Sequence, residues 1–247
     1  MGARPAIVTC LAGGGGFGYG FHMGVIDGAR DAGLDLGRWP LIGTSAGAHA
    51  AATVGTHLTF DAVADGWAAH VEQLTGSFGA RGAEMVEPIY GGLTADDVAG
   101  VAVRLLTFRR HVLRSEEVSL VDIVAASTAL FPLLRPHKID GKRYIDGGAV
   151  SLASADLAPP ADLLVVLTPF AGTHQGVVGR VGQWQANREM RKWCRHHDGR
   201  VIQVAPSPEM AALGGRRLRE VGDIELGRRV YPLARQLGRV LADTVTR

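Results

Sequence analysis

Residues 43–47 read Gly43-Thr44-Ser45-Ala46-Gly47, and this stretch decides how the chain folds. An apolar segment over 39–42 precedes it and an alanine-rich segment over 46–52 follows it, so we expect a buried strand that turns directly into a helix. Such a turn strains its middle residue and leaves no room for a Cβ on the flanking residues, which is why glycines suit positions 43 and 47. The pattern predicts a nucleophile elbow that lifts the Ser45 hydroxyl above the sheet edge.

A second short stretch, Tyr144-Ile145-Asp146-Gly147-Gly148, carries an acidic turn. The turn dipeptide at 140–141, Asp-Gly, predicts a hairpin over 139–145 that delivers Asp146 at a strand end. An aspartate before two glycines can simply end a hairpin. Beside a nucleophile elbow, however, it indicates a serine hydrolase with Asp146 as general base and with Gly147 and Gly148 shaping the turn.

A glycine-rich segment near the start, residues 13–18, follows a strand expected over 6–12 and precedes a helix expected over 22–32. Its backbone N–H groups could converge on negative charge at the helix start. Two functions fit this geometry. One is a dinucleotide site, because the segment satisfies G-x-G-x-x-G and Asp35 lies near the ribose-binding distance. The other is an oxyanion hole for Ser45, formed by Gly13, Gly14, Gly15 and Gly16.

Composition bounds the class of protein. The 247 residues are 47% hydrophobic, enough for one α/β domain over residues 1–247, and a net charge of +2 argues against a nucleic-acid partner. The two cysteines, Cys10 and Cys194, suit a reducing compartment, so we expect a cytoplasmic protein. Transient contact of this protein with a membrane surface is also compatible with the sequence. We expect no cofactor and no metal, since residues 195–198, Arg-His-His-Asp, lack metal-ligand spacing. Oligomeric state is left open.

Further elements follow from apolar periodicity, turn residues and a cap at Thr94. Short apolar strands that alternate with helices predict an α/β fold with a mainly parallel central sheet covered by helices. A glycine-rich segment over 172–182 predicts a mobile loop. The remaining expected elements are helices over 61–74, 95–108, 120–126 and 224–245, and strands over 163–167 and 201–204.

The order of these motifs resembles the patatin-like phospholipase family. The resemblance rests on four features in this order. They are the glycine-rich segment at 13–18, called the glycine loop below, then His22 and Gly24-Val25-Ile26 in the next helix, the stretch at 43–48, and Phe131-Pro132 before the acidic turn. It implies a patatin-like three-layer fold, a Ser45–Asp146 dyad and an oxyanion hole at Gly13–Gly16. It also implies hydrolysis of lipid acyl esters, of phospholipase A or lysophospholipase type, through an acyl-serine intermediate.

Two alternatives stay open. The first alternative is a lipid- or acyl-binding protein without turnover. It arises because the family usually has an arginine in the glycine loop where this chain has Phe17 or Gly18. A Ser-His-Asp esterase is the other, because His174, His196 and His197 follow Asp146. Apolar residues over 99–106 and 130–134 are expected to line an acyl pocket or to pack in the core.

Overall fold

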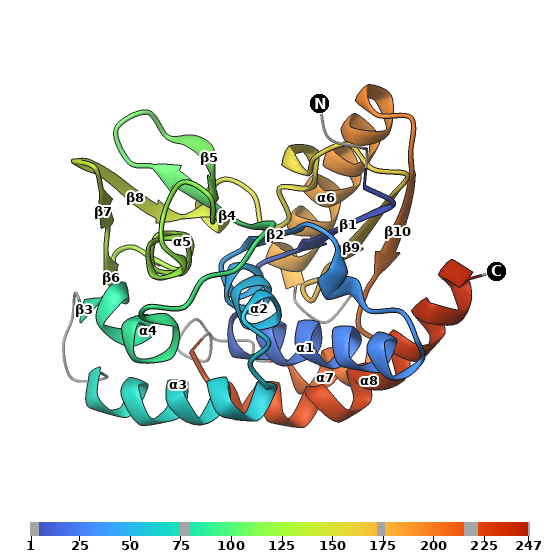
Figure 1. The fold of residues 1–247 in the computed structure, drawn as a ribbon, viewed down its shortest axis with the longest axis horizontal. Helices are drawn as coiled ribbons and strands as arrows, with labels where there is room; N and C mark the ends of the chain where they lie inside the picture. Colours follow the sequence, from blue (N-terminus) through green and yellow to red (C-terminus); the bar gives the residue numbers. More distant parts are fainter. Residues whose placement is uncertain (1–4, 75–79, 172–175, 215–221, 247) are drawn as a thin grey trace.

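The computed structural model describes residues 5–74, 80–171, 176–214 and 222–246, and it is built around one central sheet. The strand order is β10-β9-β1-β2-β4-β8-β7, and β5 pairs with the other edge of β4 (Figure 1). The pairs from β10 to β4 are parallel, whereas β5, β8 and β7 pair antiparallel. The strands are β1 Ile7–Leu11, β2 Leu41–Thr44, β4 Val98–Arg104, β5 Arg109–Arg114, β7 His137–Ile139, β8 Lys142–Asp146, β9 Leu163–Leu167 and β10 Arg200–Val204, with a small separate pair of β3 Ala80–Arg81 and β6 Leu134–Arg135.

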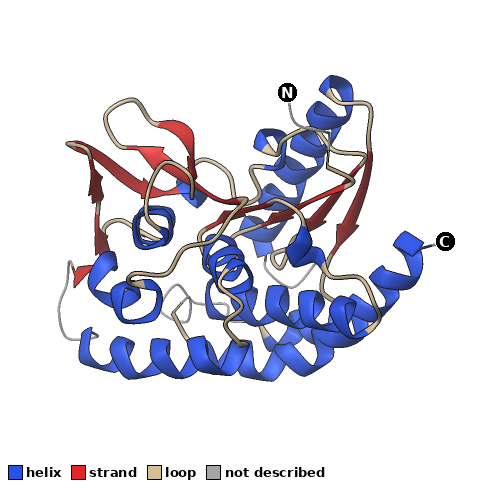
Figure 2. Ribbon diagram, viewed as in Figure 1, coloured by secondary structure: helices blue, strands red, loops and turns tan. Residues whose placement is uncertain are grey.

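Helices cover both faces of the sheet, as Figure 2 shows. Alternate residues of β1 pack into different cores: Ile7 and Leu11 join the core with α1, α2 and α8, while Val8 and Cys10 join the core with α6. This alternation produces the expected three-layer α/β arrangement with a mainly parallel sheet. The helices are α1 Gly15–Asp31, α2 Ala46–Gly55, α3 Phe60–Leu74, α4 Gly82–Tyr90, α5 Leu120–Ser127, α6 Gly176–His196, α7 Pro208–Leu213 and α8 Ile224–Thr246, with short 3-10 turns η1 Leu36–Arg38, η2 Gly147–Ala149 and η3 Ala155–Leu157.

Helices α1 and α8 touch backbone to backbone. Glycines recur every four residues along α1, at 16, 20, 24 and 28, and so share one face of the helix. A Cβ at Gly20 would overlap Gly227, and one at Gly28 would overlap the Arg235 carbonyl oxygen. The glycine-rich segment therefore extends into α1, which begins at Gly15, earlier than the expected helix start.

The helix expected over 95–108 is wrong. The chain forms strand β4 there, then a turn with Phe108 at φ 53°, then β5. Strand β4 lies between neighbours and is buried on both faces, so its apolar residues run continuously instead of alternating, and such a run cannot be told from a buried helix by periodicity. The valines and Gly100 were the usable signal. Gly100 needs its small size, because a Cβ would lie 2.6 Å from Ile123.

The mobile loop expected over 172–182 is also wrong where the structure describes it. Residues 176–182 form the first turns of α6, and 172–175 lie outside the described residues. Gly182 permits close packing, since a Cβ there would lie 2.9 Å from the Phe170 ring. The hairpin at Asp140-Gly141 is confirmed, with φ values of 46° and 78° that suit a tight turn between β7 and β8.

Candidate active site

Ser45 stands at a sharp turn between β2 and α2. Its backbone has φ 55° and ψ −120°, a conformation that a non-glycine residue rarely adopts. A Cβ at Gly43 would overlap the Gly47 backbone, and a Cβ at Gly47 would overlap the Leu11 carbonyl oxygen. The two glycines let β2, α2 and the end of β1 come close enough to hold Ser45 in this strained position.

Strand β4 brings Ser45 and Asp146 together. Its edge opposite β5 pairs first with β2, where Thr44 faces Val101, and then with β8, where Asp146 faces Ala102. Strand β2 runs parallel to β4 and β8 runs antiparallel, so their carboxyl ends point at each other across two consecutive residues of β4. The register of one strand thus places the elbow next to the acidic turn, although the two motifs are far apart in sequence.

The Ser45 side chain interacts with the carboxyl group of Asp146, a residue that is only 5% exposed. Burial raises the pKa of Asp146 to about 6, against the hydrogen bonds from Ser45 and from the Gly148 N–H, which lower it. The Gly148 N–H donates to Asp146 Oδ1 at 2.6 Å. A carboxylate with a raised pKa beside a serine hydroxyl is what a general base at neutral pH requires.

Ser127 at the end of α5 positions the elbow, and the sequence reasoning missed this role. Its hydroxyl donates to the Val101 carbonyl oxygen at 2.7 Å and accepts from the Ser45 N–H at 2.9 Å. The side chain is fully buried. No local pattern marks this residue, because its two partners lie on β4 and at the elbow, each distant in sequence.

The glycine loop lies beside Ser45. A Cβ at Gly13 would lie 3.5 Å from Ser45 Cβ, and Gly14 caps α1. The Gly13 N–H, however, donates to the Leu152 carbonyl oxygen at 2.8 Å, so the structure does not leave it available as the expected oxyanion donor. The N–H groups of Gly14, Gly15 and Gly16 stand at the helix start, where no intrahelical acceptor exists.

His22 holds the start of this loop. Its Nε2 donates to the Ala12 carbonyl oxygen at 2.6 Å, since a carbonyl oxygen can only accept. Burial lowers the pKa of His22 to about 4, against the hydrogen bond to Ala12, so the ring is neutral at physiological pH. The histidine is a positioning residue for the end of β1.

The dinucleotide interpretation has little structural support. Asp35 caps η1 by accepting from the Gly37 N–H at 3.1 Å, and it pairs with Arg30 at 3.2 Å. Its carboxylate is therefore engaged within its own turn. Phe17, one of the two positions where the family resemblance implies an arginine, is 4% exposed and packs in the hydrophobic core, and Gly18, the other position, is also buried.

The other histidines have different places. His49 on α2 is buried and bonds the Tyr90 hydroxyl at 2.7 Å, and His196 at the end of α6 bonds the Lys192 carbonyl oxygen at 2.8 Å. His174 lies outside the described residues, and α6 ends before His197. Within the described ranges, no group of three His, Cys, Asp or Glu side chains is placed to hold a metal ion.

Comparison with known proteins agrees with the order of the motifs. A family model described as patatin-like phospholipase matches residues 10–158, which include the glycine loop, Ser45 and Asp146. The chain belongs to the patatin-like phospholipase family. Membership supports a lipid acyl hydrolase.

Other comparisons add little to this assignment. The crystal structure of VipD from Legionella pneumophila is similar to this chain with a TM-score of 0.46 and 12% sequence identity, over 94% of this chain and 67% of that chain. A search of curated protein sequences found no match.

Proposed function

We propose that the protein hydrolyses acyl esters of lipids, as a phospholipase A or a lysophospholipase, with Ser45 as nucleophile and Asp146 as general base. The observation that carries the proposal is the pairing of β2 and β8 with consecutive residues of β4, which sets a strained elbow serine beside a buried carboxyl group with a pKa raised to about 6. Since this pKa lies below 7, the base form of Asp146 predominates at neutral pH while still being a better proton acceptor than an ordinary aspartate.

The steps follow from the groups present. Ser45 Oγ attacks the acyl carbonyl carbon as Asp146 accepts the hydroxyl proton, and the carbonyl oxygen becomes an oxyanion. Gly14, Gly15 and Gly16 donate their backbone N–H groups to it at the positive end of α1. The protonated Asp146 then gives its proton to the leaving alcohol, and an acyl-serine ester remains. Water, deprotonated by Asp146, cleaves that ester and frees the fatty acid and Ser45.

Apolar surroundings of the site support a lipid substrate. The Asp146 N–H donates to the Ala129 carbonyl oxygen at 3.0 Å, which places the segment after α5 beside the acidic turn. Phe131 and Leu133 in that segment are 59% and 39% exposed. Large apolar side chains left exposed in the segment that follows this contact with the acidic turn are suited to contact an acyl chain.

A covalent probe with matched variants tests the proposal. We expect a fluorophosphonate to label wild type and Ser207→Ala, a control at the N-cap of α7, but not Ser45→Ala. We expect wild type to release fatty acid from diacyl or monoacyl phosphatidylcholine, and the preferred substrate separates phospholipase A from lysophospholipase. Labelling that persists in Ser45→Ala would assign another nucleophile. Folded wild type without labelling or turnover would favour a lipid-binding protein.

A further inference from the structure

One exposed stripe runs the whole length of α6. Its members follow each other at spacings of four and three residues, which places them on a single face of the helix. The opposite face, with Gly182, Ala186, Met190 and Trp193, is buried against the sheet. The stripe consists of Val177, Val181, Trp184, Arg188, Arg191 and Arg195, all exposed.

The two halves of the α6 stripe differ in chemistry. Val177, Val181 and Trp184 in the first half are 66%, 49% and 58% exposed, and the second half is entirely arginine. Arg188 joins the halves, because its guanidinium lies 5.9 Å from the centre of the Trp184 ring. The stripe is therefore amphipathic along the helix, with an apolar end and a cationic end.

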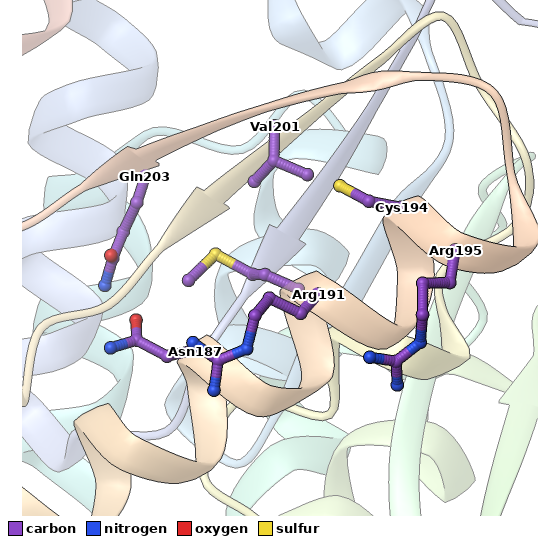
Figure 3. Close-up of a pocket in the computed structure, with 7 residues that line it drawn as sticks. Asn187, Arg191, Cys194, Arg195, Val201 and Gln203 are labelled. Atoms are coloured by element: carbon purple, nitrogen blue, oxygen red, sulfur yellow. The ribbon is translucent and has the colours of Figure 1, made fainter.

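The arginines of the stripe carry unneutralised charge. Glu189 is the only acidic residue of α6, and it is buried and paired with Arg110 at 2.9 Å. Among the described residues, none of the three stripe arginines has a salt bridge. Arg191 and Arg195 lie one helical turn apart on α6, and both line a shallow groove between α6 and β10 (Figure 3). An anionic partner would supply the missing charge.

The turns of α6 that carry the apolar half of the stripe pack, through their buried face, toward the candidate active site. Gly182, on the same turns, packs so that a Cβ would lie 3.0 Å from Leu152. Leu152 in turn accepts the Gly13 N–H at 2.8 Å, and a Cβ at Gly13 would lie 3.5 Å from Ser45 Cβ. The apolar half of the stripe therefore shares the turns of α6 that pack toward the candidate active site, but on the opposite, solvent-exposed side of the helix.

We propose that the α6 stripe docks the protein on an anionic lipid surface. Tryptophan favours the boundary between headgroups and acyl chains, and arginine binds lipid phosphates. The inference rests on the proposed function, because the docked surface would be the source of the acyl ester. None of the helices among the described residues combines the length and apolar composition of a bilayer-spanning segment, so the contact is peripheral.

A second copy of the chain fits the stripe less well. The spacing also suits a helix pair, but a parallel pair would set arginines against arginines. An antiparallel pair would set the arginines against Val177, Val181 and Trp184 and leave their charge without a counterion. Charge complementarity therefore favours lipid phosphate.

Vesicle sedimentation of the full chain tests the docking surface. We expect wild type to bind vesicles of equal phosphatidylglycerol and phosphatidylcholine more tightly than vesicles of phosphatidylcholine alone. Replacing the three stripe arginines by glutamine should weaken binding to the anionic vesicles about 100-fold. The matched control, Arg109→Gln, Arg114→Gln and Arg143→Gln, removes the same charge from exposed positions on β5 and β8 and should bind nearly as wild type.

Further readouts separate this inference from the proposed function. Trp184→Ser should weaken vesicle binding yet leave hydrolysis of p-nitrophenyl butyrate unchanged, and Ser45→Ala should dock normally. The docking surface would be overturned if the triple-arginine variant bound anionic vesicles as tightly as wild type, or if the stripe and control variants lost vesicle binding equally. Hydrolysis by wild type would still support the proposed function in either case. A wild-type dimer in light scattering that Trp184→Ser dissociates would assign the stripe to a second copy instead.

Discussion

Asp146 and Asp156 are two buried carboxyl groups on one segment of chain, and their surroundings are opposite. Among the described residues no cation pairs with Asp146, whose carboxyl group interacts with the Ser45 side chain and the Gly148 N–H, and burial raises its pKa to about 6. Burial alone would also raise the pKa of Asp156, but hydrogen bonds from Arg110 and Lys192 outweigh it and hold that pKa below the ordinary value. Arg110 binds Asp156 with both terminal nitrogens, at 2.8 and 3.0 Å.

The two aspartates differ in role: the surroundings of Asp146 suit proton transfer, and those of Asp156 suit stabilisation of the fold. A carboxylate neutralised by two cations holds β5, η3 and α6 together but is a weak base. A carboxyl group buried without a cation costs stability and gains proton affinity, which is the combination that a catalytic base needs. Asp146 therefore lowers the stability of the folded protein, and Asp156 raises it.

The largest expected effect of breaking this contrast is on turnover. Asp146→Asn should lower kcat by about 10²–10⁴-fold, because an amide cannot accept the Ser45 proton. Asp156→Asn should leave kcat near the wild-type value, because its partners Arg110 and Lys192 do not touch Ser45. Steady-state hydrolysis of p-nitrophenyl butyrate by the folded variants measures both. Comparable losses of kcat in the two variants would contradict the division of roles.

Stability should change in opposite directions. At pH 7.5, Asp146→Asn should raise the free energy of unfolding by up to about 3 kcal/mol, since it removes a buried ionised group whose pKa is about two units too high. Asp156→Asn should lower it by about 1–3 kcal/mol, because Arg110 and Lys192 lose the carboxylate that they share, while Arg110 keeps its pair with Glu189. Urea unfolding measures both values.

The pH dependence sharpens this prediction. Between pH 4 and 6 the folded protein binds a proton at Asp146 that the unfolded chain does not, so wild-type stability falls as pH rises through about 6. The gain from Asp146→Asn should therefore shrink toward pH 4. The stabilising contribution of Asp156 should persist there, because its pKa is below the ordinary value. A gain that does not change with pH would show that Asp146 is not the titrating group.

The smallest expected effect concerns the support of the elbow. Ser127→Ala leaves the Ser45 N–H and the Val101 carbonyl oxygen without this partner, so it should lower stability by about 1–3 kcal/mol. We expect kcat to fall about tenfold with little change in KM, because the nucleophile shifts while the binding surface stays. Thr128→Ala is the matched control, since that hydroxyl bonds only within α5. Equal kcat values in the two variants would remove Ser127 from the positioning role.

The sequence predicted the parts of the site that depend on local backbone geometry. Gly43, Gly47 and the Asp140-Gly141 turn each mark a conformation that few residues tolerate, so the elbow and the hairpin could be located from residue types. Ser127 and Asp156 could not, because their roles depend on partners from distant segments. The engagement of the Gly13 N–H has the same cause, since its acceptor, the Leu152 carbonyl oxygen, lies in the distant segment between β8 and β9.

The wrong prediction of a helix over 95–108 also has burial as its cause. A central strand with neighbours on both edges and helices on both faces has no polar side, and its composition then resembles a packed helix. Ala99, Val101 and Ala102 of this segment pack in the core, which was the alternative to an acyl pocket. The family resemblance was confirmed because it rested on the order of motifs, which does not depend on the secondary structure between them.

The backbone contact between α1 and α8 has a consequence for how the protein is made. The ribosome completes Ser45, Asp146 and the glycine loop well before α8, yet the glycine face of α1, whose first turn presents the loop, packs against α8 and the adjoining Asp223. A chain interrupted before residue 224 would carry every reacting group and still lack the partner of that helix. Under the proposed function, hydrolysis would therefore begin only after α8 has been made, later than every reacting group.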